Sequence, residues 1–390
     1  MKILVTNGAY KNALCAIRSL GSKGYTVGVV AHHRMAIGFF SKYCHKKHII
    51  PTLEKKAIFI AQLIEILKND TYDVLLPIGY PQTAWISEYA DKLKPYVRIP
   101  VASWDKIQIF QDKEKTQTLA KSLDIPTPKT FYPTPQYLNE IEHISDKINF
   151  PAVIKYKNEG QNHAIIYVKN KEALKHEYLK LATERPDDLP MIQEYLEGQG
   201  AGFFALYDNG VCKQYFMHER IREYPVSGGS SSCAQSIDNE RLKYYGLKIL
   251  DAIKWHGVAM VEFKFGKNTE GVLKPYLLEV NPKFWGSLDL SEAAGVGFIE
   301  KTVLVAMNQS FKINESYQKN IQFSWLFDGD LLHGIETGQA LKIMRDWLKG
   351  SFKTNIILSD PLPSLILILK NMPIILKTLF KNLFKKQHKN

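Results

Sequence analysis

The chain has 390 residues, of which 45% are hydrophobic and 23% are charged, the composition of a globular protein with two or three domains. Its four cysteines include no CxxC pair, which argues against a disulfide framework or a zinc site and favours a reducing cytoplasm. The net charge is +12, but segment 361–390 holds six lysines and no acid, so half of the excess lies in the tail and no nucleic-acid partner is expected.

The first 104 residues alternate strand-like and helix-like segments. The opening MKILVTNGAY predicts a strand, and its apolar run is too short for a signal peptide. The first turn, Asn7-Gly8, is not part of a GxGxxG motif, so we expect a strand-to-helix turn rather than a dinucleotide site. The order of elements predicts a parallel α/β sheet, with strands at 2–6, 25–31 and 73–79 and helices at 10–20 and 57–69.

A second folding unit is expected to begin at residue 105. A predicted helix over 105–123 ends before IPTP, because each proline biases its predecessor away from the helix. From residue 203 onward, short strands alternate with Gly-containing turns, the pattern of an antiparallel sheet. No segment reaches the roughly 18 unbroken apolar residues of a membrane span. Further strands are expected at 150–156, 191–198 and 257–266, and helices at 238–254 and 291–307.

Two late strands carry carboxylates where a buried strand should be apolar. If GVAMVEFKFG and YLLEVNP form a hairpin that folds about Glu270-Gly271, Glu262 lies opposite Glu279, with Cβ atoms about 4.5–5.5 Å apart. Asn281 shares the face of Glu279, because side chains alternate along a strand. Two carboxylates and an amide oxygen at one point predict a Mg²⁺ site that bridges nucleotide phosphates. The alternative is a solvated face beside an unrelated asparagine, and a bulge would change the register.

Two lysines and one mixed segment are further candidates for the site. Lys155 ends an apolar run, so a strand carries its ammonium group into the interior or a cleft, where a phosphate is its natural partner. Lys113 lies in a charged helical segment and, taken alone, predicts a solvated side chain. In MIQEYLEG, Gln193 and Glu194 lie at a strand-to-loop transition, which suits the edge of a purine.

The order of these motifs resembles the ATP-grasp superfamily, in particular its carboxylate–amine ligase-like members of the carbamoyl-phosphate synthase and biotin carboxylase type. The resemblance rests on DKEKTQTLAKSLDIPTPKT, FPAVIKY, MIQEYLEG and GVAMVEFKF followed by YLLEVNPKFWGSLDLSEAAGVG, which span roughly residues 105–310. It implies an α/β protein in which an N-terminal Rossmann-like, pre-ATP-grasp domain precedes a two-lobed α+β ATP-grasp domain.

The resemblance also implies cofactors and residue roles. The cofactors would be ATP and Mg²⁺, with Mn²⁺ as a substitute metal. Lys283 stands where relatives usually have arginine; it keeps the charge but loses the bidentate fork of an acyl-phosphate stabiliser. The loop NEGQNHA has one glycine, so a Gly-rich phosphate lid is not evident. The resemblance implies that Lys113 and Lys155 contact the ATP phosphates. It implies that adenine binds at the hinge formed by Gln193, Glu194, Tyr195 and Leu196. The metal ligands that it implies are Glu262, Glu279 and Asn281.

The segment HERIREYPVSGGSSS adds basic residues and a glycine-serine loop. His218, Arg220 and Arg222 recur at every second position, so one strand face is expected to carry all three. The loop predicts mobile amide and hydroxyl donors, and together the two features suit recognition of phosphate or carboxylate. We therefore expect Arg220, Arg222 and Lys283 to be catalytic and His218 to be structural. The alternative is an exposed basic strand with a flexible turn.

Together these observations predict a cytoplasmic, ADP-producing enzyme that activates a carboxylate as an acyl phosphate and joins it to an amine such as an amino acid. Two alternatives stay open: another ATP-grasp ligation or phosphoryl transfer, and a non-catalytic basic protein that binds a membrane or nucleic acid. The oligomeric state is not predicted. The expected divisions are 1–104 (Rossmann-like), 105–310 (ATP-grasp), 311–360 (C-terminal extension) and 361–390 (basic amphipathic tail).

The tail is expected to be helical from Ser359-Asp360-Pro361 and to be divided by Pro373. Beyond the proline, one apolar stripe lies opposite the lysines, which suits a peripheral anchor on the anionic inner face of the cell membrane; docking on the enzyme itself is the alternative. A membrane location would suit a glycan-linked carboxylate, as in cell-envelope polysaccharide biosynthesis. The stripe consists of Leu376, Leu379, Phe380, Leu383 and Phe384.

Overall fold

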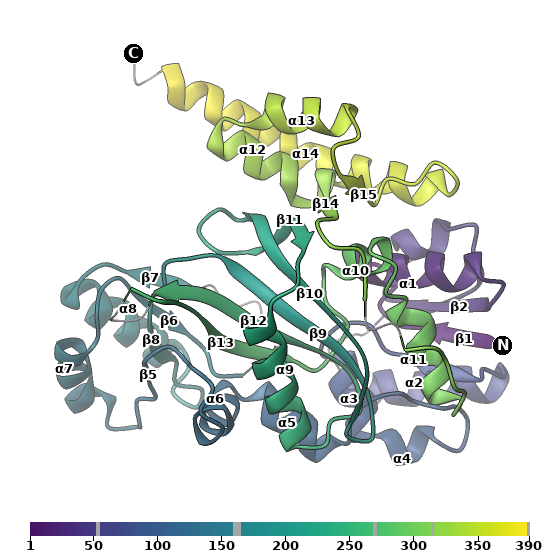
Figure 1. Cartoon of the computed structure of the whole chain (residues 1–390), viewed down its shortest axis with the longest axis horizontal. Helices are drawn as coiled ribbons and strands as arrows, with labels where there is room; N and C mark the ends of the chain where they lie inside the picture. The colour runs from purple at the N-terminus through teal and green to yellow at the C-terminus, as the bar shows by residue number, and fades with distance from the viewer. Residues whose placement is uncertain (52–54, 159–164, 268–270, 314–315, 388–390) are drawn as a thin grey trace.

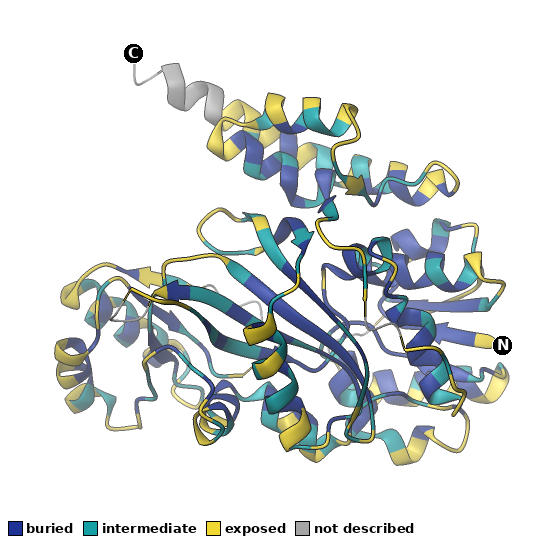
Figure 2. Ribbon diagram, in the orientation of Figure 1, coloured by how far each residue is buried: buried dark blue, intermediate teal, exposed yellow. Residues whose placement is uncertain are grey.

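The computed structural model describes residues 1–51, 55–158, 165–267, 271–313 and 316–387, with side chains as far as Lys381. Three β-sheets organise the chain, and a helical C-terminal part stands beside them (Figure 1). Most strand residues are buried or half-buried in all three sheets, whereas exposed residues concentrate on the outer helices and loops (Figure 2).

The N-terminal part is the parallel α/β sheet expected from the sequence. Its strand order is β3-β2-β1-β4, and every pairing is parallel. Strands β1, β2 and β4 are largely buried because helices cover them, as continuous apolar runs such as Ile3–Val5 require, whereas the edge strand β3 is mostly exposed. The elements are β1 (Lys2–Val5), α1 (Lys11–Ser22), β2 (Thr26–Ala31), η1 (Ile37–Phe40), β3 (Cys44–Ile49), α2 (Lys56–Asn69), β4 (Val74–Leu76), α3 (Gln82–Glu88) and α4 (Ala90–Leu93).

The middle of the chain forms a small antiparallel sheet with the order β5-β8-β6-β7. Its apolar residues pack against two helices, α7 and α8, in a separate core that includes Ile144, Ile154 and Tyr178. The elements are β5 (Thr130–Phe131), α7 (Tyr137–Lys147), β6 (Ala152–Lys155), β7 (Ile166–Val168), α8 (Lys171–Glu184) and β8 (Met191–Glu194).

A seven-stranded sheet of order β13-β12-β9-β10-β11-β14-β15 fills the centre of the molecule. Alternate residues along it belong to two cores: Phe203 and Val261 pack beneath α9, and Phe204 and Phe216 pack toward the N-terminal sheet. The elements are β9 (Gly200–Asp208), β10 (Val211–Tyr224), β11 (Ser230–Ser236), α9 (Glu240–Ala252), β12 (Gly257–Lys267), β13 (Leu273–Asn281), β14 (Gln322–Ser324) and β15 (Lys353–Thr354).

The domain boundaries drawn from the sequence stay predictions. Strands β14 and β15, which lie in the expected extension 311–360, continue the large sheet through pairing with β11. The extension therefore contributes two strands to the central sheet.

Two predicted helices are each broken in two. Segment 105–123 forms α5 (Trp104–Gln111) and α6 (Lys113–Ser122), because Asp112 leaves the helical conformation and its side chain accepts hydrogen bonds from the amides of Glu114 and Lys115. Segment 291–307 forms α10 (Leu288–Ala293) and α11 (Phe298–Ala306), separated at Gly295 and Gly297, which have φ of 83° and 69°.

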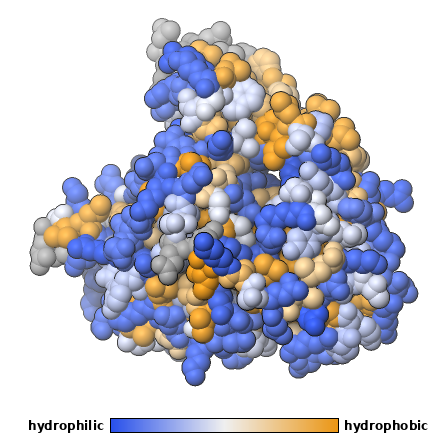
Figure 3. Space-filling view, turned by 45° about the vertical axis from the view of Figure 1, so that its right-hand side comes forward, coloured by the Kyte–Doolittle hydropathy of each residue, from blue (hydrophilic) through white to orange (hydrophobic). Residues whose placement is uncertain are grey.

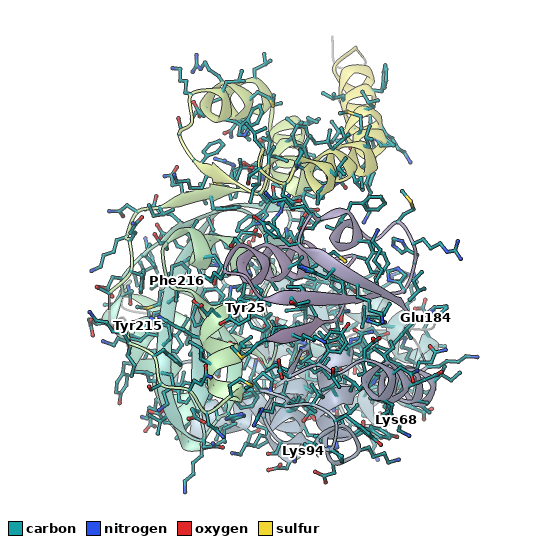
Figure 4. All side chains as sticks on the ribbon, turned by 90° about the vertical axis from the view of Figure 1, so that its right-hand side faces the viewer. Tyr25, Lys68, Lys94, Glu184, Tyr215 and Phe216 are labelled. Carbon is teal, nitrogen blue, oxygen red and sulfur yellow. The ribbon has the colours of Figure 1, made fainter. Side chains whose placement is uncertain are left out.

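The C-terminal helices stand above the rest of the molecule, as Figure 4 also shows from the side of the N-terminal sheet. The last one crosses Pro373 without ending, so the expected division at this proline is wrong. Among the described residues, one helical stretch, Pro361–Lys381, is long and apolar enough to cross a membrane by length and composition, with 22% of its most apolar part buried. Lys370, Asn371 and Lys377 interrupt this stretch, so it contains no run of 18 unbroken apolar residues, as expected. The elements are η2 (Leu326–Asp330), α12 (Leu331–Thr337), α13 (Ala340–Leu348) and α14 (Pro361–Gln387).

Candidate active site

Glu262 on β12 and Glu279 on β13 are direct antiparallel partners, which confirms the predicted pairing. The register shifts by one residue between Glu262 and Phe263, so a bulge is part of the arrangement that brings the carboxylates together. The amide nitrogen of Asn281 donates a 3.0 Å hydrogen bond to Glu279 Oε1. Part of the turn between the two strands, residues 268–270, lies outside the described residues.

The two carboxylates have different electrostatic surroundings. Burial by itself would raise the pKa of Glu279, but Lys113, Lys155, Asn281 and Lys283 outweigh it and lower the pKa to about 2. Burial raises the pKa of Glu262 above its ordinary value, despite Arg220. Like charges at close range oppose each other's ionisation, so the pKa values of two neighbouring acids move apart. Glu279 is the firmly ionised member of the pair.

Lys113 and Lys155 approach Glu279 from different elements. The break at Asp112 makes Lys113 the first residue of α6, where its side chain is buried and its Nζ lies 3.4 Å from Glu279 Oε2. The solvated position that the sequence alone suggests for Lys113 is therefore wrong. Lys155 ends β6, and burial lowers its pKa to about 8, with Glu279 acting in the opposite direction. Both ammonium groups are held beside the carboxylate pair.

Lys283 follows the same strand and extends this set. Its Nζ donates a 2.9 Å hydrogen bond to Asn281 Oδ1 and lies 5.4 Å from the centre of the Tyr80 ring. Tyr80 comes from the N-terminal part, and no pattern in the sequence pointed to it. A cavity of about 390 Å³ opens in front of these groups, and its charged and amide lining consists of Arg220, Glu223, Glu262, Lys264, Glu279, Asn281 and Lys283.

Arg220 lies in this cavity, whereas Arg222 does not line it. Arg220 Nη2 lies 2.6 Å from Glu262 Oε1, and its Nη1 donates a 3.2 Å hydrogen bond to the carbonyl of Gly229 in the glycine-serine loop. The pairing of β10 with β11 shifts between Arg220 and Arg222, so the expectation of one shared face is wrong. Arg222 instead makes two hydrogen bonds of 2.7 Å to the buried carboxylate of Asp330.

His218 is a core residue. Its side chain is buried, its ring lies 4.6 Å from that of Phe204, and its Nε2 is 2.7 Å from Ser287 Oγ. Burial, followed by the charge of Arg220, lowers the pKa of His218 to about 3. The imidazole is thus neutral and packed, as expected for a structural residue.

The hinge residues do not line the cavity of the carboxylates. Gln193 is buried and donates a 2.8 Å hydrogen bond to Thr130 Oγ1, while Glu194 accepts one of 2.7 Å from the amide of Lys129. Glu194, Tyr195 and Leu196 line a second cavity, of about 830 Å³. These two cavities share no lining residue among those described.

The Tyr195 ring connects the two cavities. It lies 4.6 Å from Lys264 Nζ and 5.7 Å from the ring of Tyr167, and both of those residues line the smaller cavity. Gly228 lies nearby with φ of 130°, where a Cβ atom would be 2.2 Å from the Tyr167 hydroxyl. The small sheet and the glycine-serine loop therefore meet at the edge of the site. The loop NEGQNHA lies largely outside the described residues, because 159–164 are not described.

The donor set fits a hard divalent cation. Glu262, Glu279 and Asn281 supply oxygen atoms from adjacent strands, as Mg²⁺ prefers. Among the described residues, no group of three His, Cys, Asp or Glu side chains is close enough to hold a metal, so the set depends on the amide oxygen and on oxygens from a ligand.

No protein-family model matches the chain. Over 228 residues it is 26% identical to the carbamoyl phosphate synthase large chain of Thermoanaerobacter sp. (strain X514), covering 56% of this chain and 20% of that one. Over 183 residues it is 29% identical to the D-alanine–D-alanine ligase of Fusobacterium nucleatum subsp. nucleatum, covering 44% of this chain and 56% of that one. The chain thus spans about a fifth of the length of the synthase that it matches.

The fold matches the biotin carboxylase domain of the 2-oxoglutarate carboxylase of Hydrogenobacter thermophilus with a TM-score of 0.65 and 18% identity, covering 82% of this chain and 73% of that one. The chain has the ATP-grasp fold. The Hydrogenobacter domain was solved with MgADP, ADP and bicarbonate. Within the ATP-grasp fold of this chain, the carboxylate pair and its lysines lie between the small and the large sheet.

Proposed function

We propose that the chain is an ATP- and Mg²⁺-dependent ligase that activates a carboxylate by attack on the γ-phosphate, forming an acyl phosphate and ADP. An amine then displaces phosphate and forms an amide. One observation carries the proposal: a paired Glu262–Glu279 set stands beside two lysines held in place by separate elements. Such chemistry needs positioning and charge neutralisation rather than a nucleophilic side chain.

Each charged group has a role in this scheme. Glu262, Glu279 and Asn281 would hold Mg²⁺, which neutralises phosphate charge when bound. Lys113 and Lys155 would contact the phosphates, which would replace Glu279 as the partner of these two lysines. Lys283, at the end of the cavity, would contact the acyl phosphate. Arg220 would position Glu262 and the glycine-serine loop, and Arg222 takes no part because Asp330 holds it.

For adenine we propose the hinge Gln193–Leu196, as the resemblance implies. Because Tyr195, Lys264 and Tyr167 lie between the hinge and the phosphate end, nucleotide binding would move the Tyr195 ring. We therefore expect MgADP to quench or enhance the tyrosine fluorescence of the wild type. This change in fluorescence should be lost in Tyr195→Leu. An identical response in both proteins would place adenine elsewhere.

The decisive experiment measures ADP release by the full chain with and without Mg²⁺, across a panel of carboxylates, including sugar acids, with amino acids as amines. Release that needs Mg²⁺ together with one carboxylate and one amine supports the ligase. Sustained, multiple-turnover Mg²⁺-dependent release without the amine favours another phosphoryl transfer on the same fold. If the chain does not bind MgATP, the alternative of a non-catalytic basic protein is favoured.

We further propose that the enzyme acts on the cytoplasmic side of the membrane, on a small or glycan-linked carboxylate, with α14 resting on anionic lipid. Exposed leucines recur along one side of this helix, and apolar residues gather over the C-terminal helices at the top of Figure 3. Basic amphipathic helices bind such interfaces. Of the stripe predicted beyond Pro373, Leu383 and Phe384 lie outside the described side chains. The exposed positions include Leu362, Leu365, Leu369, Leu376 and Phe380.

Cosedimentation with vesicles tests this location. The double variant Leu365→Gln/Leu369→Gln removes two exposed leucines, each 50% or more exposed, and would lose most binding to anionic vesicles. Val211→Gln, at a site that is 55% exposed on the large sheet, is the matched control. Equal pelleting of the double variant and the control would show that α14 does not contact the membrane. If the wild type pelleted equally with neutral and with anionic vesicles, electrostatic attraction would not contribute to binding.

A further inference from the structure

A third cavity, of about 430 Å³, lies between the N-terminal part and the C-terminal helix. Its size is in the range of small-molecule sites. One wall is the start of α1, the opposite wall is α14, and the floor is the segment after β13. Its polar lining includes Tyr10, Lys11, Tyr80, Lys283, Lys370 and Asn371.

This cavity adjoins the carboxylate-pair cavity. Lys283 and Gly286 line both of them. A molecule bound in the third cavity therefore reaches Lys283, the residue that we place at the acyl phosphate. That position is where the substrate carboxylate must lie to meet the γ-phosphate.

The lining has an excess of positive charge. Its one carboxylate among the described residues, Asp328, lies 2.9 Å from Lys11 Nζ and is thereby paired. Lys370 has no carboxylate within 4.0 Å in the described part of the chain, and its charge is among the causes that lower the pKa of His32, after burial and His33. The first turn of α1 contains no acidic residue. These groups favour an anion.

Buried contacts hold in place the part of α14 that carries Lys370. Arg18 Nε lies 2.8 Å from Asp360 Oδ2 in a pair with side-chain exposures of 8% and 2%, just before α14 begins. One turn apart along α14, Leu367 and Asn371 line the cavity, and Ile375 is buried against α12. This inward side of the helix holds the wall in place.

We infer that the third cavity binds the body of the carboxylate substrate and that this substrate carries a second anionic group, a carboxylate or a phosphate, which Lys370 recognises. The inference rests on the proposed function for the role of Lys283. The reacting carboxylate lies at Lys283, the body packs against Tyr10, Tyr80 and Leu367, and the second anion faces α14. A C-terminal helix would thus help to select the substrate.

Titration calorimetry on the full chain tests the inference, with succinate as the carboxylate probe and inorganic phosphate as the phosphate probe. MgADP is present at saturation so that the phosphate end of the nucleotide site is filled. We expect saturable binding of at least one probe, weakened tenfold or more by Lys370→Met and restored by Lys370→Arg. The control Lys342→Met removes an exposed lysine of α13 that is not part of this lining, and it should bind as the wild type does.

Equal affinity in Lys370→Met and the wild type, or no saturable binding of either probe, would overturn the inference. Lys370 is exposed, so its variants should fold, and thermal melting checks this. MgADP affinity is measured separately and should be unchanged in Lys370→Met. If the wild type does not bind MgADP, the proposed function fails, while the titrations without nucleotide still decide whether the cavity binds anions through Lys370.

Discussion

Replacing Glu279 by glutamine separates the two roles that the site gives to this residue. Without ligand, the carboxylate compensates the ammonium groups of Lys113 and Lys155; with ligand, it would hold Mg²⁺. Glutamine keeps the size and removes the charge. Both stability and turnover should therefore fall, for different reasons.

The loss of stability follows from the pKa. Lowering it from the ordinary 4.5 to about 2 corresponds to about 3 kcal/mol, at about 1.4 kcal/mol per unit. Because the folded-state pKa is the lower one, this contribution is present above pH 4.5 and is lost as the pH falls toward 2. Glu262→Gln is the matched control: burial raises the pKa of Glu262, and Arg220 keeps a second carboxylate, Glu223, 3.4 Å from its Nη1. Neutralising Glu262 should therefore cost less than neutralising Glu279.

Urea unfolding of the ligand-free proteins gives the first measurement. At pH 7, Glu279→Gln should lose on the order of 3 kcal/mol and Glu262→Gln less, and the gap should close in acid. Mg²⁺-dependent ADP release gives the second, and both variants should abolish it. Turnover of Glu279→Gln within about threefold of wild type, under ~0.7 kcal/mol, would refute the metal role. Equal destabilisation by the two variants would refute the electrostatic reasoning.

Further predictions concern two basic residues. Lys155→Met should weaken MgATP binding at least tenfold by calorimetry, and wild-type affinity should fall as the pH rises through about 8, where Lys155 loses its proton; a flat pH profile with unchanged affinity contradicts this. Arg222→Met leaves the buried Asp330 without its cationic partner, so it should cost about 3–5 kcal/mol of stability and leave the MgATP dissociation constant unchanged. Loss of turnover at full stability would instead return Arg222 to the catalytic set.

Local alternation was enough to predict the centre of the site. The pairing of Glu262 with Glu279 depends on two adjacent strands and one connection. Folding the sequence about Glu270-Gly271 reaches the correct pair, although the strands reach it through a one-residue bulge that the sequence did not reveal. The parallel N-terminal sheet was predictable for a similar reason, because its buried strands and amphipathic helices have distinct periods. Lys113 was harder to place. Its burial depends on the cap at Asp112, and an Asp before a charged helix is the signal that could have revealed it.

Features that depend on distant contacts were not predictable. Arg220 and Arg222 separate because of a bulge and because Asp330, more than 100 residues later, supplies a buried partner for one of them. Tyr80 reaches Lys283 from the turn between β4 and α3. The tail continues through Pro373 although proline removes a helical hydrogen bond, and the packing of Ile375 against α12 supports the helix there. Each of these outcomes is decided by tertiary packing.

The C-terminal helix joins the membrane proposal to the substrate proposal, and its geometry keeps the two separable. Leu365 is 50% exposed on the outer side, whereas Lys370 lines the cavity; five residues of helix place them on different faces. Fully burying an exposed leucine contributes about 1.5–3 kcal/mol, and these two leucines are 50% and 62% exposed. The Leu365→Gln/Leu369→Gln variant should therefore bind anionic vesicles at least tenfold less tightly and keep its affinity for succinate and phosphate. Lys370→Met should do the opposite, apart from about 1 kcal/mol for one lysine near anionic lipid. If both variants lose both activities in parallel, α14 acts as a single structural unit, and neither surface can be assigned to its own ligand.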